Sequence, residues 1–285
     1  MPYEKLIIFD YSGTLSLGAV LFGRSDNLME ALQECGLTDM GVSGPDVFWE
    51  SIVIPTWMKG STTDAGYKEI MKERLRELTS GNISESRLAE AVSSFVDSYL
   101  EHSSIDPRWG RILETIQNHR EILTVIATDH YAEATGSIIR HCDGLGIKAS
   151  PLNNIPSDVG ENLYVVANSA DLGCHKSDIQ FWKTLKSDLK LRKLRRVLII
   201  DDFGFNEQEE DNYGTLQKVE DRKSETIGHL NNVFSTVVDA VPFGFAEEKV
   251  KYRVNNKLNK KEEIFGEDVR YASNRIEQFI RGDRG

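Results

Sequence analysis

The stretch IIFDYSGTL, residues 7–15, begins as an apolar run and stops at a carboxylate. Continuous Ile and Phe residues are typical of a strand that is buried on both faces, as in a parallel sheet covered by helices. Asp10 follows the run directly, and Gly13 allows the chain to turn sharply close to a ligand. The stretch therefore predicts a buried strand that presents an acidic side chain at its carboxyl end.

Other short apolar runs repeat this pattern and alternate with amphipathic, helix-like stretches. The predicted strands are 5–9, 122–128, 163–168 and 196–200, with a weaker candidate at 235–241. The helix-like stretches between and after them are 107–120, 131–142, 178–191 and 267–281. Apolar strands alternating with amphipathic helices predict an α/β fold, with one parallel sheet covered by helices on both faces.

Residues 16–105 interrupt the alternation, because this interval contains helical patterns and no convincing strand. The expected helices are 26–36, 62–78 and 84–102. We therefore expect residues 16–105 to form a separate helical domain, inserted into a sheet domain made of residues 1–15 and 106–285. The polar stretch 206–226 is expected to be a solvated loop or surface helix, and 255–263 to be exposed.

Charge and composition exclude several classes of protein. The formal net charge is −11, whereas nucleic acids and membrane surfaces attract basic patches, so we expect neither as a partner. Cys35, Cys142 and Cys174 have no metal-site or disulfide spacing and are expected to be reduced thiols. No signal-peptide or membrane-spanning pattern is present, so a cytoplasmic protein is expected. The oligomeric state is left open.

Polar side chains follow each of the four strong strands, and the carboxyl ends of parallel strands are where ligands bind in open α/β sheets. They are Asp10 after the first; Thr128 and Asp129 after the second; Asn168, Ser169 and, further on, Lys176 after the third; and Asp201 and Asp202 after the fourth. Taken singly, each has an ordinary structural explanation such as capping the next helix. The ordered set instead predicts a single site at one edge of the sheet.

This set suits phosphoryl transfer. A carboxylate in a tight turn, Asp10, can act as a nucleophile and form an acyl phosphate. The oxygens of a phosphoryl group need to be neutralised, which a hydroxyl, backbone N–H groups and an ammonium can do. The pair Asp201 and Asp202 offers the hard oxygen ligands that Mg²⁺ takes, and a metal would offset the mutual repulsion of these carboxylates.

Four segments resemble the motifs of the haloacid dehalogenase (HAD-like hydrolase) superfamily, in the family's order. They are IIFDYSGTL, TVIATD, HKSDIQFW and VLIIDDFGFN. The resemblance covers residues 1–15 and about 106–240, and it implies a Rossmann-like core. It also implies that residues 16–105 are the family's helical cap, inserted between the first and second motifs.

The resemblance further implies a role for each matching residue. Asp10 would be the nucleophile, and Thr128 and Lys176 would bind the phosphoryl group. Mg²⁺ would be held by Asp10, the backbone carbonyl of Ser12, Asp202, and Asp201 either directly or through water. The implied activity is a Mg²⁺-dependent hydrolase that transfers a phosphoryl group from a small phosphorylated metabolite to Asp10 and then to water.

Ser12 departs from the family's phosphatases, which usually carry a second Asp at this place as general acid and base. A Ser hydroxyl cannot supply that function well, so a phosphatase with Ser12 should be slow unless another group helps. His130 is the best substitute among the histidines, although a hydrogen-bonding role at a helix start is at least as good an explanation.

Two alternatives remain open. A DxxGT stretch with an aromatic and a small residue is also close to the phosphonatase branch, which cleaves C–P bonds through a Schiff-base lysine of the cap, here Lys59. Alternatively, loss of the second Asp leaves a phosphate-binding or regulatory protein that does not hydrolyse.

Overall fold

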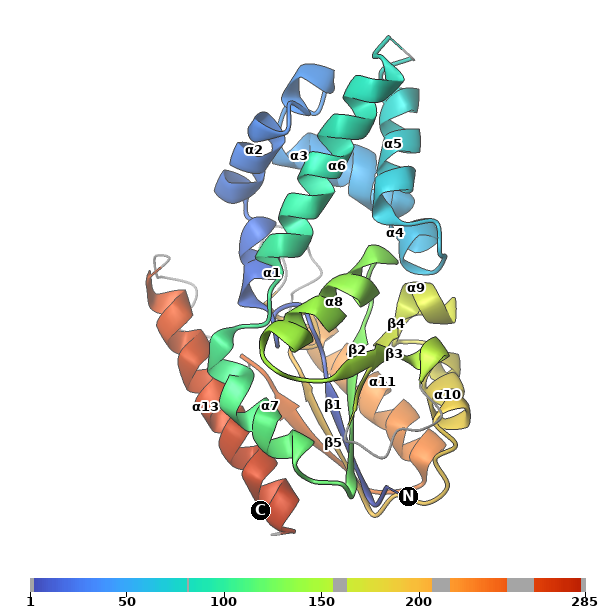
Figure 1. Cartoon of the computed structure of the whole chain (residues 1–285), viewed down its shortest axis with the longest axis vertical. Helices are drawn as coiled ribbons and strands as arrows, with labels where there is room; N and C mark the ends of the chain where they lie inside the picture. Colours follow the sequence, from blue (N-terminus) through green and yellow to red (C-terminus); the bar gives the residue numbers. More distant parts are fainter. Residues whose placement is uncertain (1–2, 81, 156–162, 207–215, 245–258, 283–285) are drawn as a thin grey trace.

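The computed structural model describes residues 3–80, 82–155, 163–206, 216–244 and 259–282. Its centre is a sheet of six parallel strands in the order β3-β4-β2-β1-β5-β6 (Figure 1). The strands are β1 Lys5–Phe9, β2 Ile122–Thr128, β3 Ala149–Pro151, β4 Tyr164–Asn168, β5 Arg196–Asp201 and β6 Val238–Pro242. The predicted α/β class is therefore confirmed.

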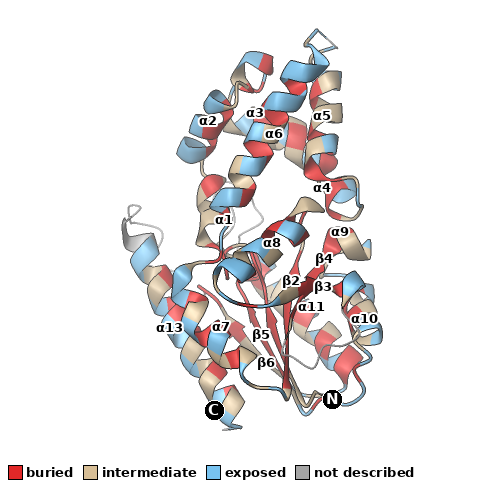
Figure 2. Cartoon of the chain, viewed as in Figure 1, coloured by how far each residue is buried: buried red, intermediate tan, exposed pale blue. Residues whose placement is uncertain are grey.

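Alternate side chains of each strand enter different cores, which explains why the strands are apolar throughout. In β1, Ile7 and Phe9 belong to one buried cluster, while Leu6 and Ile8 belong to another on the opposite face. Figure 2 shows the strands as the buried centre of this layer. The sheet thus needs helices on both faces.

The two faces are covered by helices that supply the rest of each cluster. On the first face lie α7 Gly110–Gln117, α8 Glu133–Gly144 and α13 Asn259–Arg281; on the second lie α10 Ile179–Asp188 and α11 Leu216–Phe234. The short α9 Ser169–Leu172 directly follows β4.

Most of the segment between β1 and β2, ahead of α7, forms a group of helices that lies over the carboxyl ends of the strands (Figure 1). Its helices are α1 Leu17–Phe22, α2 Ser25–Glu34, α3 Pro45–Phe48, α4 Ile54–Ser61, α5 Tyr67–Leu78 and α6 Glu85–His102, with short 3₁₀ and π segments at Thr38–Met40 and Trp49–Val53. We call this segment, residues 17–102, the helical insertion. Most of its buried apolar side chains form a third cluster, separate from the two sheet cores. Treating residues 16–105 as a domain of its own remains a prediction.

The two connections between the helical insertion and the sheet run beside each other. The backbone N–H of Asp106 donates to the Leu15 carbonyl at 2.9 Å, and the Trp109 indole N–H donates to the Thr14 carbonyl at 2.9 Å. The Tyr11 hydroxyl donates to the Ser103 carbonyl. The aromatic residue of the DYSGT turn therefore anchors the return connection.

Several predicted boundaries were wrong. The helix expected at 62–78 begins only at Tyr67, because Gly66 has φ +77° and ψ 151°, a conformation outside the helical region. The strand expected at 235–241 is β6, which begins at Val238, and β3 was missed because it has only three residues. In the polar stretch 206–226, helix α11 begins at Leu216, and residues 207–215 lie outside the described residues.

The C-terminal helix is longer than its apolar pattern predicted. It begins at Asn259, within the stretch 255–263 that was expected to be exposed, of which residues 255–258 lie outside the described part. Cys35, Cys142 and Cys174 are free thiols, as expected. Among the described helices, none is both long and apolar enough to span a bilayer.

Candidate active site

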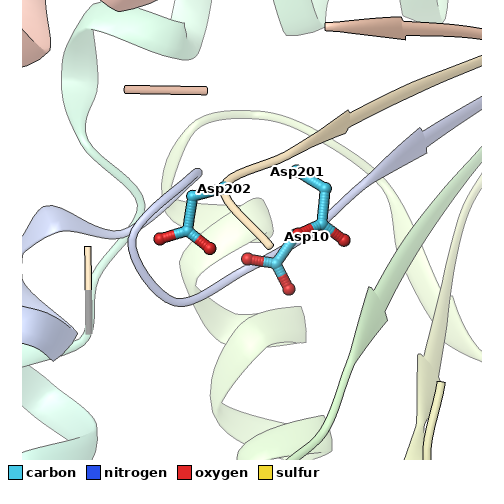
Figure 3. Close-up of side chains that lie close together, drawn as sticks. All are labelled: Asp10, Asp201 and Asp202. Atoms are coloured by element: carbon cyan, nitrogen blue, oxygen red, sulfur yellow. The ribbon is translucent and has the colours of Figure 1, made fainter. Parts of the chain in front are cut away.

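Three carboxylates meet at the carboxyl edge of the sheet, beside its central strand. Asp10 follows β1. Asp201 is the last residue of the neighbouring strand β5, and Asp202 follows it (Figure 3). The backbone N–H of Asp10 donates to the Ile200 carbonyl at 2.9 Å, which aligns the two strand ends. One oxygen from each carboxylate lies within 4.8 Å of the others, and all three residues are buried. The prediction that these three carboxylates lie close together is therefore confirmed.

The turn after β5 orients the acidic pair through backbone N–H groups. Phe203 N–H donates to Asp201 Oδ1 at 2.6 Å, and Gly204 N–H donates to Asp202 Oδ1 at 2.8 Å. Asn206 N–H donates to Asp202 Oδ2 at 3.0 Å. These donors hold both carboxylates in place.

Gly13 lets the turn after β1 pack against this acidic turn. It has φ +76°, and a Cβ at this position would lie 2.3 Å from Asp202 Oδ2, so no larger residue fits without a shift. The Asn206 side-chain amide donates to the Gly13 carbonyl at 2.9 Å and joins the two turns. Asn206 was not predicted as a site residue, although it is the last residue of the segment VLIIDDFGFN.

Lys176 reaches the same site from the segment after β4. Its Nζ lies 2.5 Å from Asp10 Oδ1 and 3.1 Å from Asp201 Oδ2. Burial alone would lower the pKa of Lys176, but the Asp10 and Asp201 carboxylates outweigh it and hold that pKa well above its usual value. The ammonium is therefore charged at neutral pH, and it is the cation that we predicted at this edge.

The backbone of Lys176 is held as firmly as its side chain. Its N–H donates to Asp129 Oδ1 at 2.9 Å, and its carbonyl accepts from the Trp182 indole N–H at 2.8 Å. Asp129 follows β2, so the neighbouring strand end fixes the peptide that carries the ammonium. Trp182 was part of the quoted HKSDIQFW segment, but its supporting role was not predicted.

The site carries excess negative charge. Burial raises the pKa of Asp10 well above its ordinary value, and Asp201 and Asp202 raise it further against the lowering effect of Lys176. With all groups ionised, the three carboxylates and the one ammonium sum to −2, a charge that one divalent cation would neutralise. Clustered carboxylate oxygens are the hard ligands that Mg²⁺ takes, and waters and a phosphate would complete its coordination shell.

Two further predicted residues lie in the surrounding elements. Thr128 is the last residue of β2 and is buried, and Ser12 is half-buried in the turn between Asp10 and Gly13. Ser12 lies near Asp10 in the sequence, and Thr128 lies near it in the sheet. Their roles toward a phosphoryl group and a metal ion remain predictions.

His130 is bonded in a way that does not suit a substitute acid. Its Nδ1 accepts the Tyr131 N–H at 2.8 Å, so in the neutral ring the proton is on Nε2, which lies 2.8 Å from the Tyr99 hydroxyl. Burial lowers the pKa of His130 to about 4. The imidazole is therefore neutral near pH 7, and the helix-start hydrogen bond is the role that its contacts support.

This lowered pKa predicts an acid-dependent loss of stability. In the unfolded chain His130 binds a proton with an ordinary pKa of about 6.5, whereas in the folded chain it stays neutral until about pH 4. The free energy of unfolding should therefore fall by roughly 3 kcal/mol as the pH drops through this window. Urea unfolding at a series of pH values measures it, and His130→Gln should flatten the curve. An equal slope in both proteins would assign the loss to other groups.

Lys59 lies in α4 and is held at the surface. Its Nζ is 3.0 Å from Glu73 Oε2, and its side chain is 61% exposed. A Schiff-base lysine must shed its proton, which burial favours and a carboxylate partner opposes. These contacts lend no support to the phosphonatase alternative.

Comparison with solved structures yielded distant structural neighbours. No family model and no curated protein matches the chain. One structural neighbour is the HAD family enzyme BT-2542 from Bacteroides thetaiotaomicron, with a TM-score of 0.46 and 12% identity, over 90% of this chain and 100% of the neighbour. An aspartate-to-alanine mutant of that enzyme, in complex with magnesium and inorganic phosphate, has a TM-score of 0.45 and 10% identity, over 86% and 98%. Similarity this low carries no conclusion about the present chain.

Proposed function

We propose that the chain is a Mg²⁺-dependent HAD-like hydrolase that transfers the phosphoryl group of a small phosphorylated metabolite to Asp10 and then to water. One observation carries this proposal: a buried cluster of three carboxylates with a lysine ammonium on its first member, at the carboxyl edge of a parallel sheet. Site location and donor chemistry both suit an anionic substrate bound beside a cation.

In the proposed reaction, an Asp10 carboxylate oxygen attacks phosphorus, and the bond from phosphorus to the leaving oxygen breaks. Lys176 and Thr128 neutralise the phosphoryl oxygens, and the released alkoxide takes a proton from water. A water molecule then attacks the phosphorus of the aspartyl phosphate, which frees inorganic phosphate and restores Asp10. Asp10, Ser12, Asp201 and Asp202 would hold Mg²⁺, which supplies charge neutralisation at the phosphate.

The turnover test compares the wild type with and without Mg²⁺ on a panel of small phosphate esters, with phosphate release as the readout. Activity that requires Mg²⁺ and disappears with EDTA is expected. A protein that binds inorganic phosphate with Mg²⁺ but releases none from any ester would favour the phosphate-binding alternative instead.

Ser12→Asp should raise the rate of phosphate release, because it adds the acid and base that Ser12 cannot provide. General acid–base catalysis contributes about 10²–10⁴-fold, so we expect an increase on the order of 10²-fold for esters with poor leaving groups. Activated esters, whose leaving group needs no proton, should show a much smaller gain and serve as the control. An equal gain on both ester types would contradict the proposed role.

The C–P alternative predicts a covalent imine on Lys59. Borohydride treatment in the presence of a phosphonate that carries a carbonyl group should leave Lys59 unmodified by mass spectrometry. A reduced adduct on Lys59 would instead favour the phosphonatase reaction.

A further inference from the structure

The segment that ends at Lys176 also binds the helical insertion, through the final residue of α4. Ser61 is fully buried, and two residues after β4 contact it. The Ser169 hydroxyl donates to the Ser61 carbonyl at 2.6 Å, and His175 Nε2 lies 2.6 Å from Ser61 Oγ. A single residue of the insertion is therefore bonded at both its backbone and its side chain.

The direction of the side-chain bond follows from a third contact. Ser61 Oγ also lies 2.6 Å from the Trp57 carbonyl oxygen, which can only accept. The hydroxyl hydrogen therefore goes to Trp57, and His175 Nε2–H donates to Ser61 Oγ. The indole ring of Trp57 stacks over the His175 ring, with centroids 5.9 Å apart and planes at 23°.

This bond lies within a packed contact between the insertion and the sheet domain. A Cβ on Gly60 would lie 2.2 Å from the Tyr131 ring, so the backbone of α4 packs directly against this side chain of the sheet domain. The Glu133 carboxylate accepts the N–H groups of Tyr67 and Lys68 at the start of α5, at 2.6 and 3.0 Å. The His175–Ser61 bond is therefore one of several contacts by which α4 and α5 dock on the sheet domain.

We propose that His175 is a positioning residue, which transmits docking of the helical insertion to the ammonium of Lys176. The two residues share a peptide bond, and the other supports of Lys176, Asp129 and Trp182, belong to the sheet domain. The bond to Ser61 adds a restraint on the residue just before Lys176, in the stretch that begins at Gly173 with φ +73°. Docking of the helical insertion thus completes the alignment of the Lys176 ammonium. The consequence of this alignment for catalysis rests on the proposed function.

The ammonium itself provides a readout that needs neither substrate nor turnover. The Lys176 side chain is only 15% exposed and its Nζ is held by two carboxylates, so the ammonium protons should exchange slowly enough to give a ¹H–¹⁵N signal, identified by its loss in Lys176→Met. His175→Ala and Ser61→Ala should both weaken or shift this signal, and the double variant should match either single one. Lys59→Ala, on the same helix but paired with Glu73, should leave it unchanged.

Binding of inorganic phosphate, measured by calorimetry at saturating Mg²⁺, tests the consequence. His175→Ala should weaken this affinity about 10-fold, a coupling typical of groups that act through one another. In a Lys176→Met background the same substitution should have no further effect. His175→Gln, which keeps a side-chain N–H donor, should restore most of the affinity, and thermal unfolding checks that each variant is folded.

The outcomes separate this proposal from the proposed function. An unchanged ammonium signal in folded His175→Ala and Ser61→Ala would overturn the positioning role, as would an equal loss of phosphate affinity with and without Lys176. If wild type binds no phosphate with Mg²⁺, the proposed function fails, and the ammonium signal still decides whether His175 positions Lys176.

Discussion

Asp10→Asn is expected to lower the rate of phosphate release on the order of 10⁵-fold, the largest effect that we predict for any single substitution. Removing a covalent nucleophile abolishes the two-step route, and in a well-studied protease such a change costs about 2 × 10⁶ in kcat. An amide also carries no charge for Mg²⁺, so the metal should bind more weakly. Steady-state phosphate release and the Mg²⁺-dependent rise in Tm together measure both losses.

Asp171→Asn is a matched control for this substitution. Asp171 Oδ2 accepts from the Thr135 hydroxyl at 2.7 Å and lies outside the acidic cluster, so its loss should leave the Mg²⁺ response intact. Trapping ³²P-labelled or mass-shifted protein after brief reaction should locate the phosphoryl group on Asp10. Activity in Asp10→Asn within 10-fold of the wild type would contradict the proposed nucleophile.

Lys176→Met is expected to produce the largest loss of stability, about 3–5 kcal/mol in the absence of Mg²⁺. The substitution removes the cation that contacts Asp10 and Asp201 and leaves buried carboxylates without compensation, a change that typically costs this much. Mg²⁺ should restore part of the lost free energy of unfolding, because it would replace the missing positive charge. Urea unfolding with and without Mg²⁺ measures the difference.

The loss should also depend on pH. Burial and the neighbouring acids raise the pKa of Asp10, so its contribution to stability is complete below the unfolded pKa and declines as the pH rises. Without the Lys176 ammonium this pKa rises further, and the Lys176→Met defect should be larger at pH 8 than at pH 4. Lys186→Met is the control, since Lys186 donates to the Val233 carbonyl away from the acidic cluster. A pH-independent defect of the same size in both variants would contradict the assignment.

Periodicity and residue type were sufficient for the sheet and for the edge that carries the site. Strands β1, β2, β4 and β5 were predicted within one residue because each is buried on both faces, which requires an apolar run. The convergence of Asp10 with the acids after β5 followed from the same rule, since parallel strands end at a common edge. These features depend on local composition and on topology, both of which are encoded in short segments.

Three supports of the site were not predicted, and two of them, those made by Asn206 and His175, join residues that are distant in the sequence. Asn206 donates to the Gly13 carbonyl, Trp182 donates to the Lys176 carbonyl, and His175 donates to Ser61. Nothing in the local pattern of either partner indicates the other. The environment of His130 was not predictable for the same reason: it is buried beside Tyr99, and burial lowers its pKa to about 4.

The amino-acid sequence by itself thus determined the layers, the approximate limits of the helical insertion and the acids that gather at the sheet edge. Only the tertiary structure decided which groups hold those acids in place, that His130 and His175 both contact the helical insertion, and that Lys59 is bound to Glu73 at the surface. The physical reason is that apolar periodicity reports burial along one chain segment. Hydrogen-bond partners and electrostatic environments are instead set by segments that meet only when the chain has folded.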